Sequence, residues 1–383
     1  MNNPFKYGKE VTGEQFYDRT ESVEELHQLL KDGVANVVLY APRRYGKTSL
    51  VVKVLQRFQA EEVSCVHFDV SKVSSVEKFC EAYASAIYGL QGGFREVVHK
   101  VLDYVAHLHP TVSGTVMGRK SIRFDYGARM NAMDLSSVLD LPEKLSSASG
   151  GKPIVIAFDE FQDIAELSKD IPLESVFRSC IQAHRNVRYV FLGSKTHLMK
   201  RMFGARTSPF YKAAQNMRIG KPPRTESEAF VVSRFAAEGV AVRPEALARI
   251  MDAACDIPYY VQAVSAYTFM SVERRKATEA TAEDVDAAIG RLLDAEADYY
   301  EEILQGLSVA QRNVLEALAA EPSARFDEGY RRRHVLTNLS TVHSSLGELV
   351  GRGLVEKDKT GYSLGDPIFV RYLTCTAAAT VYS

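Results

Sequence analysis

The chain has 383 residues, of which 46% are hydrophobic and 25% charged, a composition typical of a folded, water-soluble protein with two or three domains. Lys+Arg 47 against Asp+Glu 48 leaves a net charge of −1, so the overall charge does not favour nucleic acid or anionic lipid, although a local basic face is compatible with it. The longest apolar runs, such as residues 154–158, are far shorter than the ~20 residues of a membrane span. Five scattered cysteines without a C-x-x-C motif favour reduced thiols in a cytoplasmic protein without a zinc site.

Helix and strand patterns alternate over residues 1–220, which predicts an α/β fold with a parallel sheet. Apolar runs predict the strands, and apolar residues at helical spacing predict the helices between them. The expected strands are 36–40, 63–70, 154–158, 188–192 and 216–219. The expected helices are a short one opened by a capping box at Ser22, then 47–59, 75–88 and 94–108, and residues 111–126 are expected to form a hairpin or an insertion.

The pattern becomes helical after Gly220, with long Ala-rich amphipathic stretches and capping boxes that begin at Thr225 and Thr281. This predicts a helical domain at 221–307. Helices expected at 310–320 and 339–352 precede two short strands at 354–356 and 361–364, which is the order of a winged helix. We therefore expect three domains, at 1–220, 221–307 and 308–383.

The central motif, Ala41-Pro42-Arg43-Arg44-Tyr45-Gly46-Lys47-Thr48, follows a predicted strand and opens a predicted helix, as a P-loop requires. Backbone N–H groups at such a helix start favour phosphate binding, and Gly46 permits a close approach of the phosphates. Lys47 can reach the β- and γ-phosphates, and the Thr48 hydroxyl can bind Mg²⁺. Ala41 replaces the usual first glycine and fits if its φ is negative, as we expect. The predicted nucleotide-binding residues are Pro42, Arg43, Arg44, Tyr45, Gly46, Lys47, Thr48 and Ser49. For the two arginines, contact with a neighbouring lid or a solvent-facing position are the alternatives.

The expected strand at 154–158 ends in Asp159 and Glu160, which is the Walker B pattern. Asp159 is predicted to hold Mg²⁺, and Glu160 to orient or deprotonate the attacking water, with Lys47 as its catalytic partner. The alternative is a Gly-Lys-Thr helix start with an unrelated surface Asp-Glu pair, which the joint occurrence of both motifs at strand ends disfavours. Ser194 follows another predicted strand and is a candidate γ-phosphate sensor, with an ordinary Gly-Ser turn as the alternative.

Several further segments resemble the prokaryotic ATPases often called the archaeal ATPase family, of the STAND branch near the AAA+ proteins. The resemblance rests on residues 3–8, 16–19, 42–50, 158–162, 191–195, 208–211, 258–262 and 366–369, and it spans nearly the whole chain. It implies an ASCE-type P-loop NTPase sheet, a helical lid domain and a C-terminal winged-helix domain, with ATP and Mg²⁺ as cofactors.

The resemblance also implies positions for nucleotide contacts. Pro258 matches a lid proline that approaches the nucleotide base, although this chain has Cys255 and Asp256 where the family usually has glycines. The alternative for Pro258 is a helix start with packed aromatic residues. The segment through Tyr7, together with residues 18–19, is expected on the base side of the pocket, or else to serve as an N-terminal packing arm.

Arginines raise two further possibilities. AAA+-type ATPases often use an arginine from a neighbouring subunit, and the candidates are Arg178, Arg185, Arg201 and Arg206. Residues 331–334 (Arg-Arg-Arg-His) precede the predicted recognition helix and could contact DNA phosphates. However, residues 338–346 of that helix carry no Lys or Arg, and Glu356 and Asp358 offset Lys357 and Lys359 in the wing, so protein contact or autoinhibition is the alternative.

The predicted function is that of a Mg-ATP-binding, STAND/AAA+-like ATPase whose slow hydrolysis drives a conformational switch. The alternative is a DNA-binding ATPase that uses its winged helix in the manner of origin-recognition or mobile-element ATPases. A nucleotide-binding scaffold without turnover is disfavoured by the intact Asp159-Glu160 pair. The expected partners are ATP and ADP, with DNA, a protein partner or self-association as further possibilities, and no membrane.

Overall fold

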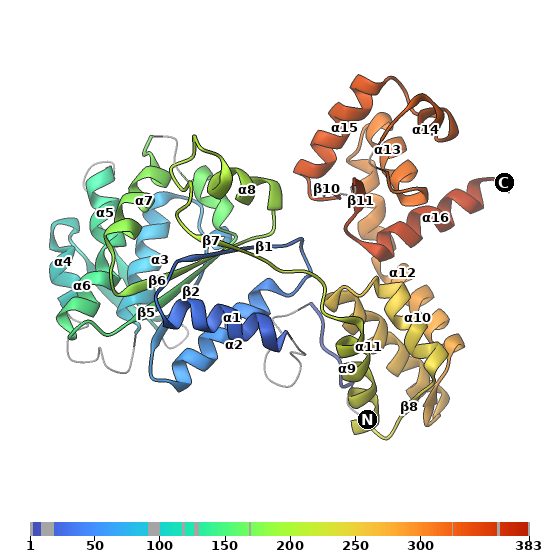
Figure 1. Cartoon of the computed structure of the whole chain (residues 1–383), viewed down its shortest axis with the longest axis horizontal. Coiled ribbons are helices and arrows are strands. Elements are labelled where there is room, and N and C mark those ends of the chain that lie inside the picture. The colour runs from blue at the N-terminus through green and yellow to red at the C-terminus, as the bar shows by residue number, and fades with distance from the viewer. Residues whose placement is uncertain are drawn as a thin grey trace. The chain divides into compact units, whose positions relative to one another are not determined.

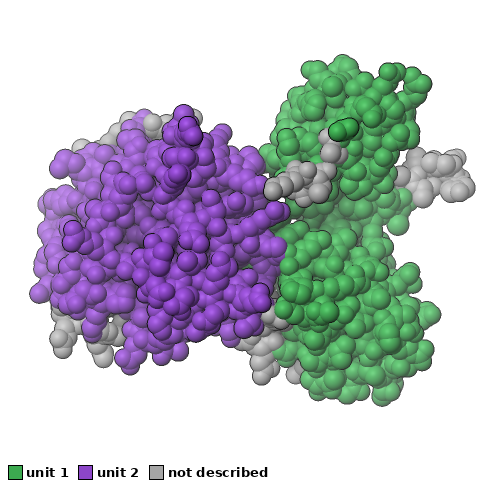
Figure 2. Space-filling model, viewed as in Figure 1, with its two compact units in different colours: residues 1–18, 42–46, 221–383 green, residues 19–41, 47–220 purple. Residues whose placement is uncertain are grey.

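A computed structural model describes residues 3–8, 19–90, 100–116, 119–125, 130–167, 170–323, 325–357 and 361–381 (Figure 1). The chain divides into two compact units (Figure 2). Unit 1 contains residues 1–18, 42–46 and 221–383, and unit 2 contains residues 19–41 and 47–220. The division runs through the P-loop motif, because residues 42–46 cluster with unit 1 whereas Lys47 and Thr48 cluster with unit 2.

Unit 2 is built on a parallel sheet of five strands in the order β2-β5-β6-β1-β7. The strands are β1 (Val37–Tyr40), β2 (Ser64–Asp69), β5 (Ile154–Asp159), β6 (Val187–Gly193) and β7 (Gln215–Arg218). All five were expected, and their ends agree with the prediction to within one residue. The α/β class is thus confirmed, and β6 lies between β1, which precedes the P-loop, and β5, which ends in the Walker B residues.

Helices cover both faces of this sheet. Figure 1 shows α1 (Thr20–Lys31) and α2 (Lys47–Ala60) on one face. The other face carries α3 (Val76–Tyr88), α5 (Ala132–Leu139), α6 (Leu141–Ala148) and α7 (Leu173–Ala183). The helix α8 (Thr196–Gly204) joins β6 to β7.

The segment between α3 and α5 contains α4 (Lys100–Tyr104) and an antiparallel hairpin of β3 (Thr111–Val116) and β4 (Arg119–Arg123). The hairpin interpretation of residues 111–126 is therefore confirmed in the part that the structure describes. Residues 94–99 of the helix expected at 94–108 lie outside the described residues.

The core of unit 2 is dense in aromatic side chains, and Phe158 of β5 lies at its centre with no exposed surface. Its ring centroid is 5.7–6.4 Å from those of seven other aromatic rings: Phe68, Phe79, Tyr83, Phe161, Phe177, Tyr189 and Phe191. Aromatic rings at such distances contribute beyond their buried area. Phe158, the residue that precedes Asp159, is thus fully buried among packed aromatic rings.

Unit 1 is mainly helical. It contains α9 (Arg224–Ala237), α10 (Pro244–Ala254), α11 (Pro258–Arg275), α12 (Ala282–Gln305), α13 (Val309–Ala320), α14 (Glu328–Arg333), α15 (Leu339–Gly351) and α16 (Pro367–Val381). An antiparallel hairpin of β10 (Val355–Lys357) and β11 (Tyr362–Leu364) follows α15, in the order expected of a winged helix. A parallel pair of two-residue strands, β8 (Ala241–Val242) and β9 (Glu279–Ala280), was not expected. The predicted boundary between 307 and 308 falls between α12 and α13, and the three-domain division stays a prediction.

Helix starts show where capping patterns hold. Thr281 caps α12 with a complete capping box, as predicted. The box predicted at Thr225 is wrong, because α9 begins at Arg224 directly after Pro223 and Thr225 lies inside the helix. The box predicted at Ser22 is also wrong, since α1 already begins at Thr20, after Arg19 in a left-handed conformation. None of the helices in the described ranges combines the length and the apolar character needed to cross a membrane.

Phe158→Ala should lower the free energy of unfolding of unit 2 by about 3–5 kcal/mol, because it leaves a cavity that the surrounding rings fill only in part. Val34→Ala is the matched control, since the Val34 side chain is 69% exposed. Urea unfolding of both variants measures the difference. Equal effects of the two substitutions would contradict the central role of Phe158.

Candidate active site

The P-loop residues lie between β1 and α2, and α2 begins at Lys47. Gly46 (φ 77°) and Arg44 (φ 70°) adopt left-handed conformations. Ala41 is not among the described residues with positive φ, so the expectation that alanine is tolerated there is confirmed. The Lys47 side chain is buried, and its Nζ donates to the Ala41 carbonyl at 2.7 Å, across the base of the loop.

Thr48 and Asp159 are 111 residues apart in sequence and meet in the structure. The Thr48 Oγ1 hydroxyl donates to Asp159 Oδ2 at 2.7 Å, and the Glu160 N–H donates to Asp159 Oδ1 at 2.9 Å. His67 Nε2 on β2 lies 3.4 Å from Asp159 Oδ2. Burial is the largest influence on the pKa of Asp159 and raises it, but His67, Thr48 and the Glu160 N–H together outweigh burial and hold this pKa below its usual value.

This arrangement fits Mg²⁺ when a nucleotide is present. The hydroxyl of Thr48 and the carboxylate of Asp159 supply oxygen atoms, which Mg²⁺ prefers, and Mg²⁺ is commonly held by one or two carboxylates together with substrate phosphates and water. Across the described ranges, no group of three or more His, Cys, Asp or Glu side chains gathers into a metal site of its own. A metal held here would therefore depend on further oxygen atoms from phosphate or water.

Glu160 and Ser194 are also brought together, because β5 and β6 are neighbours and both end at the same edge of the sheet. Glu160 Oε2 accepts from Ser194 Oγ at 2.7 Å and from the Ser194 N–H at 3.2 Å. Glu160 itself has a left-handed backbone (φ 48°, ψ 42°), a conformation that costs free energy in a residue with a side chain and recurs at functional sites. Ser194 thus contacts the predicted catalytic carboxylate, and its sensor role stays a prediction.

Sequence reasoning gave no role to Gln162, whose amide Nε2 donates to Glu160 Oε2 at 2.6 Å. Its side chain is almost fully buried, at 3% exposure. Its sequence signal is its place in the segment 158–162, which is one of those that carry the family resemblance.

Arg44 is held within unit 1. Its Nη1 lies 2.6 Å from Asp366 Oδ2, and its guanidinium lies over the rings of Tyr259 and Tyr260, at 4.6 and 4.9 Å from their centroids. The Tyr259 N–H also donates to the Arg44 carbonyl at 3.4 Å. The solvent-facing alternative therefore does not describe Arg44, whereas Arg43 is exposed.

The two carboxylate oxygens of Asp366 bind different groups. Its Oδ2 binds Arg44, while its Oδ1 accepts from the N–H groups of Ile368 and Phe369 at the start of α16. The Tyr300 hydroxyl, on α12, also donates to Oδ2 at 3.3 Å. A residue 322 positions after Arg44 thus connects this P-loop arginine to the start of the last helix.

Pro258 is the first residue of α11 and immediately precedes the two tyrosines that pack on Arg44. Its position agrees with the helix-start interpretation, and contact with a nucleotide base stays a prediction. Cys255 (φ 49°) and Asp256 (φ 55°), which replace the expected glycines, are both left-handed. The backbone that glycines would favour is thus present here without them.

The N-terminal segment and the candidate trans-acting arginines are placed as follows. The ring of Tyr7 packs edge-on against that of Tyr259, at 5.9 Å, while Asp18 lies outside the described residues. Arg19 is buried and precedes α1. The four candidate arginines lie on or just after two helices of unit 2. Arg178 is on α7 and Arg185 follows that helix, whereas Arg201 is on α8 and Arg206 follows it. Their predicted role stays open.

The residues of the basic run before α15 have partners within unit 1, and its arginine ion pairs lie on the surface. Arg333 and His334 both pair with Glu321, at 3.0 and 3.1 Å, and Arg332 pairs with Glu328 at 2.9 Å. Arg331 donates to the Phe326 carbonyl at 3.0 Å. Of the wing charges, Asp358 and Lys359 lie outside the described residues. Phosphate contact by these arginines would compete with partners that they already have.

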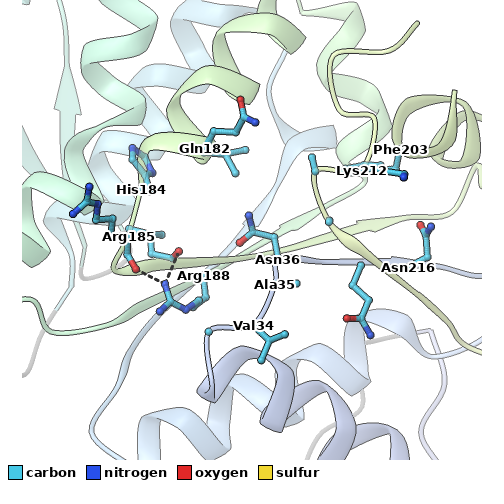
Figure 3. A pocket seen from close by; sticks show the side chains of 16 residues that line it. Val34, Ala35, Asn36, Gln182, His184, Arg185, Arg188, Phe203, Lys212 and Asn216 are labelled. Atoms are coloured by element: carbon cyan, nitrogen blue, oxygen red, sulfur yellow. Dashed lines mark hydrogen bonds between the residues drawn. The ribbon is translucent and has the colours of Figure 1, made fainter. Parts of the chain in front are cut away.

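A separate cavity of about 550 Å³ lies at the opposite edge of the sheet, where β1, β6 and β7 begin (Figure 3). Asn36, His184, Arg188 and Lys212 are among its lining residues. The Arg188 guanidinium donates to the Arg185 carbonyl. The His184 ring is hydrogen-bonded to the Tyr189 hydroxyl and to the Asp140 carboxylate. The cavity is lined by Arg185, one of the candidate trans-acting arginines, but by none of the predicted P-loop or Walker B residues.

Comparisons with known proteins agree with this geometry. The model of a family described as an ATPase domain predominantly from Archaea matches residues 16–219, and a model described as a probable winged helix domain matches residues 298–375. No curated protein matches the chain.

Solved structures share the fold at low sequence identity. A Walker-type ATPase of Pyrococcus abyssi is 15% identical, with a TM-score of 0.69 over 97% of this chain and 99% of that one. The Aeropyrum pernix ORC2 protein, in its ADPNP and ADP complexes, is 14% identical, with a TM-score of 0.60 over 99% and 100%. The Aeropyrum pernix ORC1 protein in complex with DNA is 14% identical, with a TM-score of 0.51 over 97% and 96%. These matches confirm the expected P-loop α/β fold with a C-terminal winged helix.

Arg44→Met and Asp366→Asn should be coupled by roughly 1 kcal/mol in a double-mutant cycle of unfolding free energies, because each alone breaks the same half-exposed ion pair. Asp366→Asn retains an oxygen that can cap α16. The control cycle is Arg332 with Glu328, which are 81% and 77% exposed and should show almost no coupling. Urea unfolding at low salt and in 1 M NaCl measures both cycles. Coupling no larger for Arg44 and Asp366 than for the control pair would refute a structural role for the contact.

Proposed function

The chain belongs to the family described as the ATPase domain predominantly from Archaea, and on this premise we propose that it binds ATP with Mg²⁺ and hydrolyses it slowly as a STAND/AAA+-like conformational switch. ATP rather than GTP is favoured by the resemblance and by the lack of an N-K-x-D motif. Partners, in this proposal, are ATP and ADP together with a protein that senses the switch.

The observation that carries the proposal is the meeting of Thr48 with Asp159 and of Glu160 with Ser194 at one edge of the sheet. Residues of these types are needed together for phosphoryl transfer to water. Lys47, now on the Ala41 carbonyl, is placed beside the loop whose N–H groups would bind the phosphates. None of these contacts depends on a ligand.

Each residue has a role in the proposed reaction. Lys47 would bind the β- and γ-phosphates, and Thr48 and Asp159 would hold Mg²⁺. Mg²⁺ would neutralise the charge that develops on the phosphate oxygens. Glu160 would orient the attacking water and accept its proton, while Ser194 keeps the Glu160 carboxylate in place.

The switch is supported by the contacts of Arg44. Residues 42–46 cluster with unit 1, and Arg44 binds Asp366 at the start of α16 and the tyrosines of α11. Lys47 and Thr48 cluster with unit 2. ATP would drive a change if it bound one arrangement of Arg44 and its unit 1 partners more tightly than another.

A DNA-binding ATPase is the second candidate. It is supported by the winged-helix match at residues 298–375 and by fold similarity to a protein solved in complex with DNA. The ion pairs of Arg332 and Arg333 weigh against it, as does α15, in which residues 339–351 contain no Lys or Arg.

Lys47→Ala should weaken ATP binding by about 100-fold, because it removes a charged donor to the phosphates. Glu160→Gln should retain ATP binding and lower kcat by at least about 100-fold, because the amide cannot accept a proton from water. Titration with a fluorescent ATP analogue and a phosphate-release assay measure the two effects. Lys53→Ala is the control, since Lys53 is an exposed lysine of the same helix. Wild-type turnover in the Glu160→Gln variant would show that Glu160 is not the base.

The ATPase rate should not change when duplex DNA is added at low or moderate salt, because residues 339–351 of α15 offer no Lys or Arg to DNA. Neutralising residues 331–333 should likewise leave the rate unchanged. Glu160→Gln reports the background of contaminating ATPases. Stimulation by DNA that fades as salt rises, and that is lost when residues 331–333 are neutralised, would favour the second candidate.

A further inference from the structure

The two oxygens of the Glu160 carboxylate are in different situations. Oε2 accepts from Gln162 Nε2 and from both the hydroxyl and the N–H of Ser194. A carboxylate oxygen offers about two lone-pair sites, so three donors fully occupy it. Within the described residues, Oε1 accepts no hydrogen bond, and it is therefore the oxygen left to accept a proton from water.

Gln162 is the donor that comes from the same chain segment as Glu160. The left-handed backbone at Glu160 turns the chain at the end of β5, and Gln162, two residues later, bonds back to it. Its Nε2 also donates to Asp163 Oδ1 at 3.2 Å, and Asp163 in turn binds Lys195 Nζ at 3.0 Å. The reversed amide would set its oxygen against two carboxylates, so the chemistry fixes the nitrogen on this side.

The oxygen of the Gln162 amide, Oε1, indicates that this side chain is not explained by the stability of the fold alone. Gln162 Oε1 is buried and has no hydrogen-bond partner in the part of the chain that the structure describes. An unsatisfied buried oxygen destabilises the fold relative to an apolar side chain of the same size. The buried amide oxygen thus lowers the stability of the fold, whereas the amide nitrogen donates to Glu160 and Asp163.

Gly193 makes room for this amide. A Cβ built on Gly193, the last residue of β6, would meet Gln162 Oε1 and the Met199 side chain at distances no real Cβ shows. Gly193 does not have a positive φ, so its backbone does not require glycine. A side chain at residue 193 would therefore require the ends of the Gln162 and Met199 side chains to move.

From these contacts we propose that Gln162 is a positioning residue for ATP hydrolysis, which fixes the rotation of the Glu160 carboxylate so that Oε1 faces the attacking water. The inference rests on the proposed function of Glu160 as the base. Without Gln162, Oε2 keeps only the donors of Ser194, and the carboxylate spends less time in the productive orientation. Misorientation of a catalytic group lowers the rate of the chemical step without weakening substrate binding.

The test replaces Gln162 with methionine, which has a similar length and volume but no donor. Gln162→Met should lower kcat about 10-fold while KM for ATP and the affinity for a fluorescent ATP analogue stay unchanged. Its thermal midpoint should stay close to that of the wild type, because removal of the buried unpaired oxygen offsets the loss of the two hydrogen bonds to carboxylates. Gln182→Met is the control, since Gln182 is exposed and lines the cavity at the other edge of the sheet. A lowered midpoint with an unchanged kcat would show a merely structural role and overturn the inference.

A double-mutant cycle tests whether Gln162 acts through Glu160. In single-turnover measurements, Gln162→Met should cause no further loss when Glu160 is already Gln, because the group that it orients is absent. A full 10-fold loss in that background would overturn the inference. Wild-type protein that hydrolyses no ATP would overturn the proposed function itself. Hydrolysis that is lost in Glu160→Gln but intact in Gln162→Met would overturn this inference alone.

Discussion

The insertion of β6 between β1 and β5 is the constraint on which the site depends. Parallel hydrogen bonding aligns Tyr40 with Gly193 and Phe158 with Phe191, so the three strands end together. Different functional groups follow the three strands at this edge of the sheet. The P-loop follows β1, the carboxylates of Asp159 and Glu160 lie at the end of β5, and Ser194 follows β6. A different strand order would keep every motif and separate the groups, since the motifs specify residue types and the sheet supplies the distances.

The elements of unit 2 could be predicted because their signals are local. A buried parallel strand is a short apolar run, and the five such runs matched the five strands. The errors arose where short-range patterns compete. Thr225 fits a capping box, but Pro223 ends the preceding extended segment and α9 begins one residue earlier. The strands β8 and β9 were missed because two residues are too few to show any periodicity.

The candidate site divides in the same way. Lys47, Thr48, Asp159 and Glu160 could be named from the sequence because phosphate chemistry requires these residue types in fixed local contexts. Contacts made through the fold could not. Arg44 and Asp366 are separated by 322 residues, and nothing in either segment specifies the other. The partners of the run at 331–334 could not be named from the sequence either, because only the fold shows that Glu321 lies beside Arg333 and His334.

Cys255 and Asp256 give unit 1 a property that its helices lack. Two successive residues with side chains hold left-handed conformations in the turn between α10 and α11, each at a conformational cost of order 1–3 kcal/mol. That turn is followed directly by Pro258 and by Tyr259 and Tyr260, whose rings pack against the Arg44 guanidinium. Left-handed residues also occur elsewhere in unit 1, at Lys276 and Val335, so this cost is not confined to the turn. The left-handed turn thus sets the direction in which the chain leaves α10 and enters α11, whose first tyrosines pack on the P-loop arginine.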